Sequence, residues 1–186
     1  MLKYNIVITL FTIVYGLMLT DLFLSFHKLI RYRKKVKWHW LPLLTAWYLF
    51  LIILKNWWDL SSLQNSVDSM NIYFFIAYGH LLFLTFLLVS TALPDIIEKS
   101  ELDLKSYYFR NHRYFWGLMS SVVVLSIVIN FIKRFHELDT SVIFILLAVI
   151  ILPILTITLA ITKRYRVHST IIIILVIGVV FEIINR

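Results

Sequence analysis

Six apolar runs, each close to the length of a membrane-spanning helix, occupy most of the chain and limit what it can fold into. They cover residues of about 4–29, 41–58, 71–94, 114–132, 141–162 and 169–185. A helix needs about 20 apolar residues to cross a bilayer. Backbone groups in lipid must hydrogen bond within their own segment, and the runs show no alternation of polar and apolar residues. The sequence therefore predicts an all-α, polytopic integral membrane helix bundle, with residues 1–186 forming a single transmembrane domain.

The composition supports a lipid environment. Of the 186 residues, 61% are hydrophobic and 15% are charged, whereas soluble domains are nearer to half apolar and a quarter charged. A chain of this length could not bury so much apolar surface in one water-soluble core. We therefore expect a multi-pass protein of a bacterial cytoplasmic membrane, the inner membrane of the cell, with the lipid bilayer as its main partner.

The basic residues predict how the bundle is oriented. The connections after the first, third and fifth runs hold 13 of the 18 Lys and Arg residues. Such connections face the cytoplasm, so both termini are expected outside, an N-out/C-out topology. The net charge of +8 is then explained by topology. No DNA- or RNA-binding motif accompanies it, and we do not expect a nucleic acid as a partner.

The stretch "SELDLKSYYFRNHR", residues 100–113, has two interpretations. Ser100 and Asp103 resemble a capping box, which would begin a short interfacial helix lying along the cytoplasmic face before the fourth run. The alternative is a plain charged loop. The sequence does not decide between them.

Asp21 is the most conspicuous polar residue inside an apolar run. Ionisable residues within membrane helices are rare and usually face the bundle interior, so each is a candidate site. Asp21, Ser25 and Lys28 share one face of the first helix. Either Lys28 and Ser25 partly satisfy the carboxyl group near the interface, or Asp21 and Ser25 belong to an ion or proton pathway.

Three further ionisable residues are pathway candidates. His80 lies in the middle of the third run, and imidazole titrates near neutral pH, although a lone histidine also serves as a hydrogen-bonded packing element. Lys55, near the end of the second run, has Asp59 as an expected i+4 partner. Glu182 has the same spacing to Arg186 in the sixth run.

Pro153 falls midway through the fifth run and predicts a kink there. Such a kink can act as a hinge or remain an inert bend. The hydroxyl groups of Thr156, Thr158 and Thr162, which follow it, could help to satisfy freed carbonyl groups.

Recognisable catalytic chemistry is missing from the sequence. It contains no cysteine, no HExxH motif, no P-loop and no GxSxG elbow. No second intramembrane histidine lies at the depth of His80, and the other histidines are scattered over helix ends and match no zinc site. We therefore expect no enzyme, no metal and no cofactor.

Three functional hypotheses remain after these exclusions. The first is transport, with the bundle acting as a channel or transporter-like conduit for a proton, an ion or a small solute. The second is a non-catalytic membrane sensor, accessory subunit or membrane-perturbing effector. The third, an intramembrane enzyme acting on lipid or quinone, lacks clustered acids, bases or ligands at one depth. A homo-oligomer or a membrane partner subunit fits either of the first two.

Overall fold

The computed structural model of the chain describes residues 2–60, 72–94, 101–134 and 142–185. Within these ranges, the predicted all-α bundle is confirmed. The helices are α1 (Leu2–Arg31), α2 (Trp40–Asp59), α4 (Ile72–Ser90), α5 (Leu104–Arg134), α6 (Val142–Ile161) and α7 (Tyr165–Ile184). By length and composition, α1, α2, α4, α5 and α7 can each cross a membrane. Helix α6 is 20 residues long and contains Pro153.

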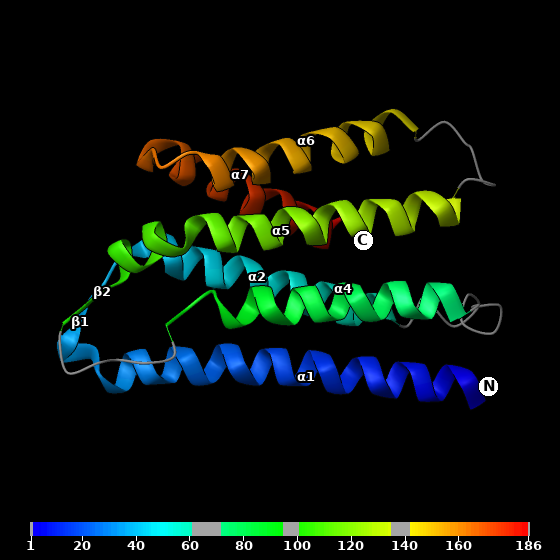
Figure 1. Cartoon of the computed structure of the whole chain (residues 1–186), viewed down its shortest axis with the longest axis horizontal. Helices are drawn as coiled ribbons and strands as arrows, with labels where there is room; N and C mark the ends of the chain where they lie inside the picture. Colours follow the sequence, from blue (N-terminus) through cyan, green and yellow to red (C-terminus); the bar gives the residue numbers. More distant parts are fainter. Residues whose placement is uncertain (1, 61–71, 95–100, 135–141, 186) are drawn as a thin grey trace.

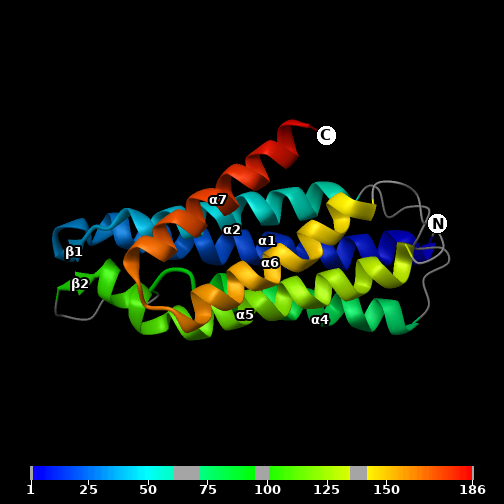
Figure 2. The same ribbon diagram turned by 90° about the horizontal axis from the view of Figure 1, so that it is seen from above.

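The helices run alternately in opposite directions, and α7 runs toward the end of the bundle at which α1 begins but stops well short of it (Figure 1). In this view α1, α4, α5 and α6 lie side by side in that order, with α2 and α7 behind them (Figure 1). Helix α7 packs against α2, and the view from above shows it crossing the bundle at an angle, with its C-terminal end pointing away from the other helices (Figure 2). This arrangement agrees with the predicted termini on one side and basic connections on the other, while the side that faces the cytoplasm stays a prediction.

Helix α1 joins the bundle through a stripe of buried side chains spaced alternately by four and three residues. The stripe consists of Phe11, Tyr15, Met18, Leu22, Ser25 and Leu29. A mean spacing of 3.5 residues keeps one face of a helix against its neighbours. The Phe11 ring stacks on Phe75 of α4, with ring centroids 6.3 Å apart. The stripe explains why Ser25 is buried, whereas Asp21 is only half-buried beside it.

The stretch 100–113 differs from both sequence interpretations. Helix α5 begins at Leu104 and continues without interruption to Arg134, so the described part is neither a separate interfacial helix nor a loop. Asp103 caps this helix, because its Oδ1 accepts hydrogen bonds from the backbone N–H of Lys105 (2.8 Å) and Ser106 (3.2 Å). Ser100, the other half of the expected capping box, lies outside the described residues.

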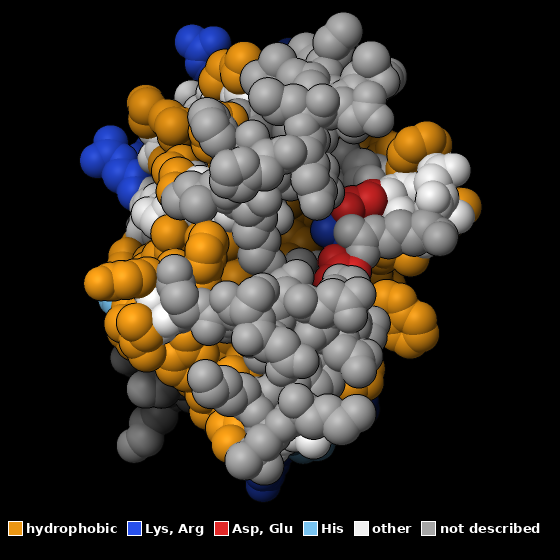
Figure 3. All heavy atoms as spheres, turned by 90° about the vertical axis from the view of Figure 1, so that its right-hand side faces the viewer, with side chains coloured by type: hydrophobic (Ala, Val, Ile, Leu, Met, Phe, Trp, Pro, Cys, Tyr) orange, Lys and Arg blue, Asp and Glu red, His pale blue; other side chains and the backbone are white. Residues whose placement is uncertain are grey.

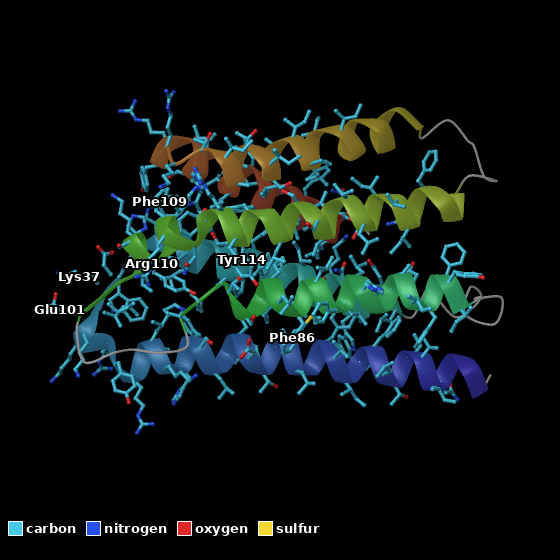
Figure 4. All side chains as sticks on the ribbon, in the orientation of Figure 1. Lys37, Phe86, Glu101, Phe109, Arg110 and Tyr114 are labelled. Atoms are coloured by element: carbon cyan, nitrogen blue, oxygen red, sulfur yellow. The ribbon has the colours of Figure 1, made fainter. Side chains whose placement is uncertain are left out.

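Two short strands join the connection after α1 to the start of α5. A 3₁₀ turn, η1 (Arg33–Lys35), leads into β1 (Val36–Lys37), which pairs in parallel with β2 (Leu102–Asp103). Lys37 Nζ lies 2.7 Å from Glu101 Oε2, and both side chains are exposed at this end of the molecule (Figure 4). The strands were not expected from the sequence, because two residues give no detectable alternation.

His39 caps the start of α2. Its Nδ1 accepts a hydrogen bond from the Leu41 backbone N–H at 3.3 Å, which requires an unprotonated nitrogen. Desolvation first, and the charge of Lys105 second, lower the pKa of His39 from its ordinary value of 6.5. The unfolded chain therefore binds the proton more readily than the folded one. The stability that this cap contributes is present above pH 6.5 and is lost as the pH falls below it.

Asparagine at position 39 would cap α2 at any pH. We expect wild-type protein to lose about 1 kcal/mol more of its free energy of unfolding than His39→Asn between about pH 8 and pH 5. The measurement is reversible unfolding in mixed detergent micelles at both pH values. Equal losses for the two proteins would show that protonation of His39 does not weaken the cap.

Pro153 is accommodated inside α6, which continues on both sides of it. The Thr156 hydroxyl donates to the carbonyl oxygens of Leu152 and Pro153, at 3.1 Å each. Thr158 donates to the Ile154 carbonyl at 2.7 Å. The hydroxyl groups thus bind carbonyls of the turn that contains the proline.

Candidate functional site

A cluster of buried polar side chains lies where the first turns of α2, α5 and α7 meet. It comprises Thr45, Tyr108, His112, Trp116 and His168, which we call the histidine cluster. All five side chains are buried; His168 and Trp116 have no exposed surface and His112 is 2% exposed. Burying polar groups is costly unless they are hydrogen bonded, so their partners define the site.

The hydrogen bonds of the cluster have a defined direction. The Thr162 carbonyl can only accept, so His168 donates to it from Nε2, at 2.7 Å. A neutral His168 then accepts at Nδ1 from the Tyr108 hydroxyl, at 2.8 Å. The indole of Trp116 can only donate, and its Nε1 lies 2.9 Å from the same hydroxyl oxygen. The resulting chain runs from Trp116 through Tyr108 to His168 and ends at a backbone carbonyl.

A second histidine lies beside this chain. The rings of His112 and His168 have centroids 5.8 Å apart. The Phe109 carbonyl accepts a hydrogen bond from Nδ1 of His112 at 2.7 Å, which leaves Nε2 as an acceptor. Within the described part of the chain, this buried Nε2 has no hydrogen-bond partner.

The sequence of α5 brings these side chains together by simple spacing. Leu104, Tyr108, His112 and Trp116 follow one another at intervals of four residues, and Leu104 is buried as well. Residues at i and i+4 share a helix face. With 31 residues, α5 is about 46 Å long and exceeds an apolar core of about 30 Å. Because its first turns are its polar part, we expect the cluster to lie near one membrane surface.

The opposite ends of α2 and α7 carry an ion pair. Lys55 Nζ lies 2.9 Å from Glu182 Oε1, with side chains that are 19% and 46% exposed. Glu182 is also close enough to Tyr48 for an electrostatic interaction. Figure 3 looks onto this end of the bundle and shows basic and acidic side chains close together in a hollow.

Both polar sites lie on the same pair of helices. Helix α2 contributes Thr45, Tyr48 and Lys55, which are separated by three and seven residues. Helix α7 contributes His168 and Glu182, which are fourteen residues apart. We call this interface, defined by those five residues, the α2–α7 seam. At the end that contains the histidine cluster, a further hydrogen bond joins the two helices: Trp40 Nε1 donates to the Tyr165 hydroxyl at 2.9 Å.

The interior of the seam between its two polar ends is apolar. Leu49 and Ile53 lie between Thr45 and Lys55 on α2, Ile172 and Leu175 lie between His168 and Glu182 on α7, and all four are buried. From Thr45 to Lys55 is about 15 Å along α2, from the helix rise per residue. The seam therefore holds ionisable groups at both ends and hydrocarbon in the middle.

The structure brings together only some of the predicted site residues. Lys55 and Glu182 meet each other, although each was expected to pair four residues along its own helix. The Lys55–Asp59 pair stays a prediction, and Arg186 lies outside the described residues. The His80 side chain is exposed on α4 and its Nδ1 bonds the Ile76 carbonyl of the same helix at 2.9 Å, while its place in a pathway stays a prediction. Asp21 and Ser25 lie on α1, outside the seam.

Metal binding receives no support from the described residues. They contain no group of three or more His, Cys, Asp and Glu side chains placed to hold an ion. His112 and His168 also use three of their four ring nitrogens in hydrogen bonds.

Comparison with known proteins adds no functional information. No protein-family model, curated protein or solved structure matches the chain significantly. The function must therefore be argued from the two polar sites and from their position on one helix pair.

Proposed function

We propose that this multi-pass membrane protein is a conduit that passes protons along the α2–α7 seam. The observation that carries the proposal is the placement of ionisable groups at both ends of one helix pair, the Lys55–Glu182 pair at one end and His168 at the other. Intramembrane ionisable residues mark ion and proton pathways more often than other positions. A carboxylate, a tyrosine hydroxyl and an imidazole are all groups that exchange protons with water or with one another.

The hydrogen bonds of the cluster suit proton transfer. His168 can take up a proton at Nδ1, on the Tyr108 side, and release one from Nε2, on the Thr162 side. For transfer in the opposite direction, His168 takes up the proton at Nε2 and releases one from Nδ1. At the other end, the Glu182 carboxylate, which lies 2.9 Å from Lys55 Nζ, is the group that exchanges protons with water. Transfer between the ends requires water to enter the apolar middle of the seam for part of the time.

Proton flux into vesicles tests this proposal. The purified protein is reconstituted with a pH-sensitive dye inside, and a potassium diffusion potential drives protons inward. We expect wild-type protein to acidify the lumen faster than protein-free vesicles do, and Glu182→Gln to remove this difference. The matched control is Glu101→Gln, the same substitution at the exposed opposite end of the molecule, which should keep the wild-type rate.

A variant that lacks both charges of the ion pair but still folds separates a loss of proton flux from a loss of folding. Replacing both partners of an ion pair by neutral residues is often tolerated. We expect Lys55→Met/Glu182→Gln to retain its helix content and still pass no protons. Wild-type flux in this double variant would contradict the proposed role of the pair.

The apolar middle of the seam favours a second candidate, a non-catalytic proton sensor or accessory subunit. Because Leu49, Ile53 and Leu175 separate the two polar ends, each end could respond to pH without passing a proton to the other. Wild-type vesicles with no flux above background, combined with a pH-dependent fluorescence of Trp116, would support this candidate and exclude the conduit.

A further inference from the structure

The connection between α1 and β1 carries a dense set of exposed cations that the proton pathway does not use. Arg31 ends α1, and Arg33, Lys34 and Lys35 form the 3₁₀ turn η1, which contains no buried residue. All four side chains are exposed. We call Arg31, Arg33, Lys34 and Lys35 the basic turn.

The basic turn has a fixed backbone. The Tyr32 N–H donates to the Lys28 carbonyl at 3.0 Å, and the Lys35 N–H donates to the Tyr32 carbonyl at 2.8 Å. The turn is followed directly by β1, whose Val36 pairs with Leu102 of β2. These main-chain hydrogen bonds hold the backbone of the four basic residues together, so their charges are concentrated on one short turn.

Two acids of the described residues, Glu101 and Asp103, lie on the stretch that pairs with β1, and both are engaged elsewhere. Glu101 pairs with Lys37, as Figure 4 shows at the end of the bundle. Asp103 accepts two backbone N–H bonds at the start of α5. The pairing of Lys37 and Glu101 lowers the pKa of Glu101 and raises that of Lys37, so both stay charged and bound to each other near neutral pH. Neither acid is positioned by these contacts to neutralise the basic turn.

Aromatic rings place the basic turn at the depth of lipid headgroups. Trp38 and Trp40, which follow β1, are 44% and 41% exposed, and Tyr32 within the turn is 42% exposed. Exposed tryptophan and tyrosine rings at helix ends settle at the membrane–water interface. The turn also directly follows α1, a candidate membrane span. The groups that surround it in a membrane are the phosphates and other headgroups of lipids.

We propose that the basic turn binds anionic phospholipid headgroups. Clusters of four to eight Lys and Arg residues directly beside a membrane span are typical of such binding. Guanidinium groups bind phosphate oxygens through two parallel hydrogen bonds, and lysine adds a compact positive charge. This inference does not depend on the proposed proton pathway, because it concerns an exposed surface at the end of α1.

Lipid selectivity can be measured from tryptophan fluorescence. Wild-type protein is reconstituted in mixtures of phosphatidylcholine with brominated phosphatidylglycerol, or with brominated phosphatidylcholine, and quenching gives the relative binding constant of the anionic lipid. We expect a preference for phosphatidylglycerol of about tenfold or more, since each cation near an anionic surface raises binding several-fold. The preference should weaken at high salt.

Two triple variants separate the basic turn from general positive charge. Arg33→Gln/Lys34→Gln/Lys35→Gln should bind the two lipids almost equally. Lys163→Gln/Arg164→Gln/Arg166→Gln, which removes three cations from the connection before α7 and from its first turn at the same end of the bundle, should keep most of the preference. Helix content in phosphatidylcholine alone checks that both variants fold.

Two results would overturn the proposal. One is an unchanged preference in the variant of the basic turn, or an equal loss in both variants. The other is a wild-type protein without any preference for phosphatidylglycerol. The latter would leave the turn as an orientation signal or as a surface for an acidic protein.

Discussion

Tyr108→Phe should lower the free energy of unfolding by about 2–5 kcal/mol. The substitution removes one oxygen, but two buried groups lose their partner with it, Nε1 of Trp116 and Nδ1 of His168. A buried polar group without its hydrogen bond costs about 1–3 kcal/mol. The measurement is equilibrium unfolding in mixed micelles, followed by tryptophan fluorescence.

Tyr114 provides the control for this prediction. It lies on the same helix (Figure 4) and its side chain is 56% exposed. Tyr114→Phe should therefore change stability by less than about 0.5 kcal/mol, as is usual for exposed positions. Similar losses for both variants would mean that the Tyr108 hydroxyl has no special role in joining α5 to α7.

The second large effect concerns the ion pair. Glu182→Leu removes the carboxylate that lies 2.9 Å from Lys55 Nζ, and the Lys55 side chain is only 19% exposed. Breaking one side of a buried pair is costly, and the partial exposure of Glu182 reduces the cost to about 1–3 kcal/mol. Lys55→Met should cost less, because the carboxylate that remains is the more exposed partner.

The double variant distinguishes charge pairing from packing. Lys55→Met/Glu182→Leu removes both charges and should recover most of the stability lost in Glu182→Leu, because no charge remains to be stabilised. Additive losses in the same unfolding assay would indicate that the two side chains contribute through packing, independently of each other.

The sequence predicted the helix bundle well because each helix is indicated by a long, continuous apolar run within its own segment. Apolar runs of about 20 residues can satisfy their backbone only as helices in lipid, and all six appear as helices within the described residues. The sequence left open whether "SELDLKSYYFRNHR" is a helix or a loop, because the stretch is polar. Its helix continues to the capping residue Asp103 through contacts of Tyr108 and His112 with other helices, which hydropathy does not reveal.

The histidine cluster was missed for a related reason. His112 and His168 lie near helix starts, where polar residues usually face the membrane interface, and sequence alone does not show that other helices cover them. One signal was present: His168, Leu175 and Glu182 are separated by seven residues each, which places them on one stripe of α7. The four-residue spacing of Tyr108, His112 and Trp116 gives the same indication on α5.

The ion pair shows the limit of local rules. Partners at i+4 were expected for Lys55 and for Glu182 because helix geometry makes such pairs close. The structure joins these two residues to each other, although they are 127 positions apart. Only the packing of α2 against α7 creates this contact, and pairwise spacing within a helix carries no information about it.

A proton current across a supported membrane tests the central claim most directly. Protein-containing vesicles are adsorbed on an electrode, and the external pH is changed while all other ions stay equal on both sides. The conduit proposal predicts a current for wild-type protein that is absent for Lys55→Met/Glu182→Gln and for lipid alone. A wild-type current equal to that of lipid alone would contradict it.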